Sequence, residues 1–94
     1  MAGISKTVVG IRAGKMDQAY KFIDSQSHLT SEIDGMIGFA VAATGENELT
    51  VIGIYESTKA AESASSRVSG VFSEMAPLMS NTPERGIFSG AWFS

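Results

Sequence analysis

The sequence predicts a single α+β domain over residues 1–94, with four strands and two helices in the order βαββαβ. Ninety-four residues fit one compact domain, because single domains usually span ~50 to ~200 residues. Hydrophobic residues make up 44% of the chain and charged residues 18%. This composition provides enough apolar residues for a core and lacks the high charge content of a disordered segment. Two stretches carry apolar residues at helical spacing, and four shorter stretches are rich in strand-forming residues.

The first half of the chain predicts a strand, a helix and a second strand. A strand is predicted for 5–12, where valine and isoleucine give β-branched density before an Ala-Gly break. One helix is predicted for 15–33, which contains no Pro or Gly and has an apolar stripe centred near Ala19 and Ile23. An Asp-Gly pair ends this helix, and a strand over 36–44 follows.

The second half predicts a hairpin, a long helix and a final strand. A Gly-Glu-Asn turn leads into a strand over 48–56. Ser57 or Thr58 can cap the second helix, whose apolar stripe continues for roughly six turns. Pro77 should kink or fray the last turn, and the final strand is predicted for 86–93. Short connections in this order favour the ferredoxin-like plan, an antiparallel four-stranded sheet with both helices on one face.

The strands are apolar on both faces, whereas an antiparallel sheet with one face in water should alternate apolar and polar residues. In the third strand one face carries Leu49, Val51, Gly53 and Tyr55, and the other carries Ile52 and Ile54. In the second strand one face carries Ile37, Phe39 and Val41, and the other carries Met36, Gly38, Ala40 and Ala42. In the last strand one face carries Phe88, Gly90 and Trp92, and the other carries Ile87, Ala91 and Phe93. We therefore expect a homodimer in which two copies pair sheet against sheet. The alternatives are a different protein or a bound lipophile on the same face.

Charge and composition exclude several classes of function. Seven Lys and Arg against ten Asp and Glu give a net charge of -3, without the basic excess of a nucleic-acid-binding protein. With no Cys and a single His, we expect no disulfide, thiol nucleophile, zinc finger or iron–sulfur site, and no metal site that needs two imidazoles. No signal-peptide pattern and no apolar run near ~18 residues is present, so we expect a cytoplasmic protein with no membrane partner.

Three segments carry a resemblance to a known family. Residues 34–41 have the sequence DGMIGFAV, residues 51–57 have the sequence VIGIYES, and Ala60 and Ala61 open the next helix. In these features, and over nearly the whole chain, the sequence resembles the antibiotic-biosynthesis-monooxygenase-like family. The resemblance implies a dimeric α/β barrel. It also implies a possible activity, since that family includes cofactor-independent monooxygenases of aromatic polyketides as well as haem-degrading enzymes.

The sequence departs from that family in informative places. Asp34 stands where Pro often precedes Gly, and Tyr55 stands where Trp is common. A haem-degrading activity would need an axial imidazole on the second helix, but 59–79 contains no His. Haem chemistry of that type is therefore not expected.

Two polar residues fall inside the apolar stripe of the first helix. Gln26 and Thr30 face the predicted sheet, where an unpaired amide or hydroxyl is costly. They either line a ligand cavity between helix and sheet or make polar contacts at the end of the helix. His28 lies on the opposite side with Asp24 and Glu32, a spacing that fits a solvated charged face better than a metal site.

Aromatic residues complete the predicted ligand site. Tyr20, Tyr55 and Trp92 could stack on or hydrogen-bond a small planar organic ligand, although each is equally suited to a core. Arg67 flanks the stripe of the second helix and could reach an anionic ligand at the cavity mouth, or lie at the surface. The family resemblance implies that, if the protein is an enzyme, it is a cofactor-independent monooxygenase acting on such a molecule. The alternative is a non-enzymatic small-molecule-binding or regulatory dimer.

Overall fold

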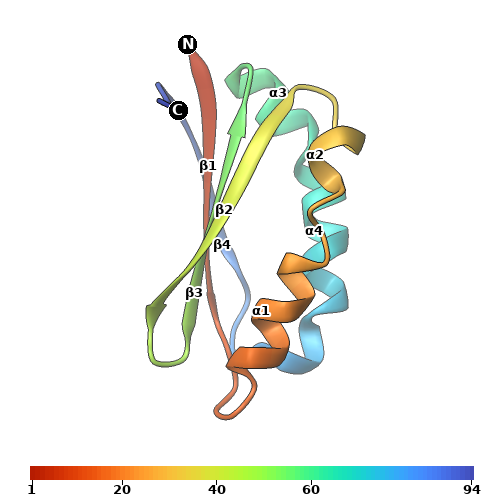
Figure 1. Ribbon diagram of the computed structural model, residues 1–94, viewed down its shortest axis with the longest axis vertical. Helices are drawn as coiled ribbons and strands as arrows, with labels where there is room; N and C mark the ends of the chain where they lie inside the picture. The colour runs from red at the N-terminus through yellow and green to blue at the C-terminus, as the bar shows by residue number, and fades with distance from the viewer.

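The computed structural model describes residues 1–94 and has two layers, a sheet and a set of helices that cover one of its faces (Figure 1). The four strands pair antiparallel in the order β2-β3-β1-β4. This arrangement confirms the predicted ferredoxin-like α+β fold. The elements are β1 (Ala2–Gly10), α1 (Met16–Asp24), α2 (Leu29–Glu32), β2 (Met36–Gly45), β3 (Glu48–Tyr55), α3 (Thr58–Ser63), α4 (Ser65–Glu74), the 3₁₀ helix η1 (Ala76–Leu78) and β4 (Glu84–Gly90).

The predicted first helix is two helices, which corrects the prediction of one helix over 15–33. Between α1 and α2, the backbone N–H groups of Gln26 and Leu29 donate to carbonyls three residues back, the pattern of a tighter 3₁₀ turn. The hydroxyls of Thr30 and Ser31 also donate to the carbonyls three residues back. Such local bonds compete with the regular helix. The break turns α2, so that its buried Leu29 packs in a different cluster from the buried residues of α1.

A β-bulge near the start of β2 changes which residues share a face. Met36 pairs with Tyr55 and Gly38 with Ile54, so Ile37 is an extra residue on β2. Met36 therefore lies on the helix-facing side with Phe39, and the predicted grouping of Met36 with Gly38 is wrong. The predicted faces of β3 agree with the pairing of β1 and β3.

Two core clusters fill the space between the layers. The first joins the lower ends of β1 and β3 to α1 and α4: Val9, Ile11, Ala19, Ile23, Leu49, Phe72 and Met75. The second joins the other end of β3 to α2 and α3: Leu29, Ile33, Tyr55, Ala61 and Ala64. None of the helices combines the length and hydropathy needed to cross a membrane.

The start of α3 is held by a side-chain cap. Ser57 has an extended backbone, and its Oγ accepts a hydrogen bond of 3.1 Å from the N–H of Ala60. Ser57→Ala should lower the free energy of unfolding by about 1 kcal/mol, because that N–H loses its partner. Urea unfolding followed by circular dichroism measures the difference. Ser57→Asp should retain most of the stability, and Ser66→Ala on α4 serves as the surface control; equal midpoints for Ser57→Ala and wild type would contradict the assignment.

Candidate functional site

A cavity lies between the sheet and the helices, where the two core clusters meet. Its lining includes Ile23 and Phe72 from the first cluster and Leu29 and Tyr55 from the second. The space that water-sized molecules can fill measures about 50 Å³, and all the space between the atoms, open solvent included, spans about 500 Å³. The smaller volume has room for about three to five water molecules, whereas a cavity that binds benzene measures about 150 Å³. A planar ligand would therefore extend beyond the smaller volume.

The floor of the cavity is formed by β1 and β3. Ser5 pairs with Gly53 in the sheet register, and both face the helices. A Cβ atom at Gly53 would lie 2.6 Å from Ser5 Oγ, 3.0 Å from Tyr55 Cε1 and 3.4 Å from the Tyr55 hydroxyl. The two hydroxyls thus approach the same space, which exists because residue 53 has no side chain.

Three hydroxyls of the floor are free to bind a ligand. Ser5, Thr7 and Tyr55 are 5%, 2% and 1% exposed. None of their hydroxyls takes part in a side-chain hydrogen bond with the protein. A hydroxyl without a hydrogen-bond partner would be counted as buried and unsatisfied if it had no accessible surface, but Nε of Arg85 is the one such atom in the chain. The three hydroxyls therefore have accessible surface, which lies in the cavity. A buried hydroxyl gains free energy when it finds a partner.

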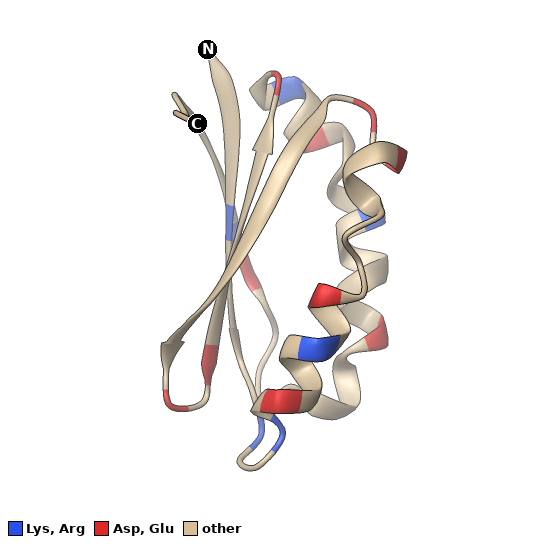
Figure 2. Ribbon diagram, viewed as in Figure 1, with Lys and Arg blue, Asp and Glu red and all other residues tan.

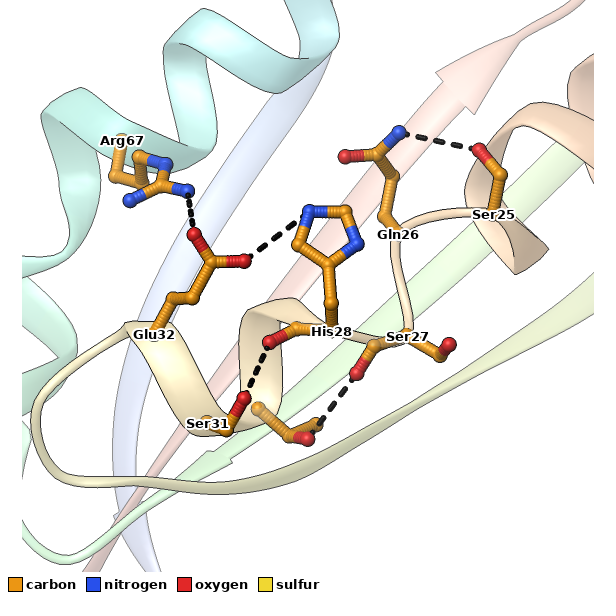
Figure 3. Close-up of polar contacts among 8 residues, drawn as sticks. Ser25, Gln26, Ser27, His28, Ser31, Glu32 and Arg67 are labelled. Atoms are coloured by element: carbon orange, nitrogen blue, oxygen red, sulfur yellow. Dashed lines mark hydrogen bonds and ion pairs between the residues drawn. The ribbon is translucent and has the colours of Figure 1, made fainter.

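A groove of about 350 Å³ between the α1–α2 connection and α4 adjoins the cavity, and we refer to it as the mouth. Gln26 and Leu29 line both the cavity and this groove. Figure 3 shows Glu32 of α2 between Arg67 of α4 and His28. The Glu32 carboxylate lies 3.1 Å from Arg67 Nη2 and 3.3 Å from His28 Nε2. All three side chains are about half exposed, so these contacts add little stability; the Arg67–Glu32 pair joins α4 to α2 beside the mouth, whereas His28–Glu32 lies within one segment.

The structure brings together part of the predicted site. Gln26 and Tyr55 line the cavity, and Arg67 lines the mouth groove. Thr30 lines neither, because its hydroxyl donates to Ser27 O at 3.1 Å, which is the helix-end contact named as the alternative.

The other two predicted aromatic residues lie apart from the cavity. Tyr20 on α1 is 46% exposed, and Trp92, beyond the end of β4, is 41% exposed. Neither lines the cavity or its mouth. Both assignments required the side chain to point between the layers, and a pattern of single aromatic residues does not determine that direction.

Ser5 and Thr7 were missed by the sequence analysis. They alternate with Ile4 and Lys6 on β1, so one face of this strand carries Ser5, Thr7 and the fully buried Val9. Polar residues at alternate positions before a buried apolar residue are the signal that could have found them. The signal has meaning only once the partner strands show which face the helices cover.

The lining of the cavity limits its chemistry. It includes no Asp, Glu, His, Lys or Arg, and Tyr55 is its one titratable residue. The side chains can donate and accept hydrogen bonds around one polar group of a mostly apolar ligand. No group of His, Asp or Glu side chains in the chain is arranged to hold a metal ion.

By sequence, the chain matches no family model and no curated protein. By structure, it is similar to several solved proteins. A protein of unknown function from Nitrosomonas europaea superposes with a TM-score of 0.80 at 13% identity, covering 99% of this chain and 94% of that one. A protein named a "putative antibiotic biosynthesis monooxygenase", also from Nitrosomonas europaea, gives a TM-score of 0.78 at 12% identity over 97% and 91%.

An oxygenase is also among the similar structures. A variant of SnoaB, a cofactor-independent oxygenase from Streptomyces nogalater, gives a TM-score of 0.75 at 10% identity, covering 98% of this chain and 95% of that one. At such identities the comparison concerns the fold and not the chemistry. The resemblance seen in the sequence is confirmed at that level: this chain has the fold of the antibiotic-biosynthesis-monooxygenase-like proteins.

Proposed function

We propose that the protein binds a small planar organic molecule in the cavity and mouth, and oxygenates it without a cofactor. The observation that carries this proposal is the convergence of two unpartnered hydroxyls, those of Ser5 and Tyr55, over Gly53 in an otherwise apolar cavity. Such a cavity suits a ring with one polar group that the hydroxyls orient. The fold shared with a cofactor-independent oxygenase supports the reaction class.

The reaction we propose uses the acidity of the substrate itself. A carbanion stabilised by a phenol or ketone transfers an electron to O₂, and recombination forms a peroxide. Loss of water then leaves a carbonyl, so a CH₂ group and O₂ yield C=O and H₂O. Because the cavity has no carboxylate, imidazole or amine, the protein contributes hydrogen bonds to the anion and positioning rather than a strong base.

An oxygen electrode with a panel of phenols and quinols tests the proposal. At least one substrate should give O₂ uptake well above the uncatalysed rate. Ser5→Ala and Gln26→Leu should each lower kcat/KM about three- to tenfold, the effect of one neutral hydrogen bond. Thr30→Val, which alters a residue outside the cavity, is the matched control and should be unchanged. Equal losses in the control and in the cavity variants would contradict the assignment.

The pH profile of the same reaction is a separate prediction. With no strong base in the cavity, the rate should rise with pH along the ionisation of the substrate and should shift when a more acidic substrate is used. Stopped-flow measurements with two quinols of different acidity would show this. If the midpoint of the rise in rate fell at the same pH for both substrates, a protein base would be indicated and the mechanism would be contradicted.

A non-enzymatic binding or regulatory role is the second candidate. The absence of a strong base from the cavity favours it, because binding needs none. The two candidates differ in one measurement. Saturable binding of a quinol with no O₂ uptake would select the binding role.

We also infer that the protein is a homodimer. The sheet face opposite the helices carries Ile4, Val8, Ile52, Ile54 and Phe88, with Phe88 56% exposed. Figure 2 shows that most charged residues lie on the helices and at the turns, with few along the strands. A second copy presenting the same face would bury this surface.

A further inference from the structure

Arg85 is a half-buried cation without an anionic partner in the protein. In β4 it pairs with Thr7, so its side chain lies on the helix-facing side of the sheet. It is the one arginine of three that is not exposed. Its Nη1 donates to Ser65 Oγ at 2.7 Å, and its Nη2 donates to the carbonyl of Ala61 at 3.2 Å.

The charge of Arg85 has no counter-ion in the protein. Both ion pairs of the chain use Glu32, and none involves Arg85. Its Nε is sealed from solvent and has no hydrogen-bond partner, so the donors left for a ligand are the second N–H groups of Nη1 and Nη2. Two neutral oxygens offset part of the cost of burying a guanidinium, but five N–H donors and a full charge need more than that.

A groove beside Arg85 has the lining that an anion requires. It lies between α4 and β4, measures about 360 Å³ and includes no acidic residue. Its polar lining is supplied by Arg85 and four hydroxyls, those of Thr7, Ser69, Ser73 and Thr82. Phe72, Met79 and Pro83 add apolar surface for an organic group. The groove shares Thr7, Val68 and Phe72 with the cavity, but Arg85 lines the groove and not the cavity, so an anion held by Arg85 would lie outside the cavity.

We propose that this groove binds a small organic anion, a carboxylate or a phosphate ester, through Arg85. A guanidinium forms charge-assisted hydrogen bonds with such groups that are about twice as strong as neutral ones. The Ser69 hydroxyl can donate to a remaining oxygen, whereas the Ser73 hydroxyl already donates to the carbonyl of Ser69 at 2.9 Å. This proposal does not depend on the oxygenase activity, because the groove at Arg85 is not the proposed substrate cavity.

A purely structural role for Arg85 makes a different prediction. Ala61 lies in the last turn of α3, where backbone carbonyls lack partners within the helix. A cation that accepts this role stabilises the C-terminal end of the helix. Arg85 would then join β4 to α3, and no anion would bind. Stability measurements alone do not separate the two roles, because both lose stability when Arg85 is replaced. A titration does.

The test is an NMR titration of the protein with benzoate and with phenyl phosphate, and with benzyl alcohol as the neutral control. The amides of Ser69, Ser73 and Thr82 should shift and saturate with at least one anion and not with the alcohol. The anion whose chemical-shift changes saturate identifies the anionic group that the groove prefers. Arg85→Gln should weaken that binding about tenfold or more, as expected for lost charged hydrogen bonds. Lys21→Gln, which removes an exposed cation on α1 that lines neither the groove nor the cavity, should leave it unchanged.

A second variant keeps the test decisive if Arg85→Gln does not fold. Ser69→Met fills the groove while leaving the hydrogen bonds of Arg85 in place, and should weaken the binding of the anion to a similar degree. The proposal is overturned if neither anion binds at about 20 mM, where a site with a Kd near 1 mM would be saturated. It is also overturned if the shifts are confined to Ser5 and Gly53, which would instead place the anion in the cavity.

Discussion

Replacing Gly3 with alanine should destabilise the protein by about 3 kcal/mol or more. At this position a Cβ would lie 2.2 Å from the carbonyl oxygen of Ser57, 2.5 Å from its carbon and 2.7 Å from the nitrogen of Thr58. All three are backbone atoms at the start of α3, so no side chain can rotate away. Overpacking of this kind usually costs ~1–3 kcal/mol, and a backbone neighbour places Gly3 at the upper end. Urea unfolding followed by circular dichroism measures the change.

Gly70→Ala is the matched control, because it makes the same substitution with the opposite expected sign. Gly70 lies inside α4, and a Cβ there would meet nothing within 4 Å. Alanine should raise the free energy of unfolding by about 0.5–1 kcal/mol, since it favours the helix and restricts the unfolded chain. If Gly3→Ala changed stability by less than 1 kcal/mol, the close packing of β1 on α3 would be wrong.

Local chemistry made most elements of this fold predictable. The Asp-Gly turn after α2 has Gly35 at φ +79°, a conformation that glycine adopts without strain. Ser57 caps α3 as expected, and Pro77 lies in the 3₁₀ helix that follows α4. Each of these features is determined by one or two residues and their neighbours in sequence. The break between α1 and α2 was harder, because hydrophobic periodicity continues through it.

The candidate site was only partly predictable, because it depends on contacts between distant segments. The helical stripe placed Gln26, which lies two residues beyond the end of α1, but failed for Thr30, which lies beyond the break in the helix. The approach of Ser5 to Tyr55 over Gly53 depends on the register of β1 against β3. Register also determines that Arg85 faces the helices beside Thr7. A sequence pattern gives the two faces of a strand but not which of them the helices cover.

Replacing Ile52 with aspartate should convert the proposed dimer into a folded monomer. Ile52 lies in β3, one of the two inner strands of the sheet, on the face opposite the helices. Its neighbours across the strands are Lys6 and Ala40. In a monomer the new carboxylate would be in water and cost little. Within an apolar interface between two copies it would be buried, at a cost of several kcal/mol that pairing with Lys6 would offset only in part.

The dissociation constant of the dimer should therefore rise by at least about 100-fold, which corresponds to about 2.7 kcal/mol. Sedimentation velocity between micromolar and hundred-micromolar protein measures it, and circular dichroism verifies that the variant is folded. Lys21→Asp changes charge on the exposed side of α1 and should leave the dimer intact. A wild-type monomer throughout this range, or an Ile52→Asp protein that dimerises as well as wild type, would contradict the pairing. Since the outer face lies across the sheet from the cavity, the monomeric variant should still bind a quinol, which would separate assembly from ligand binding.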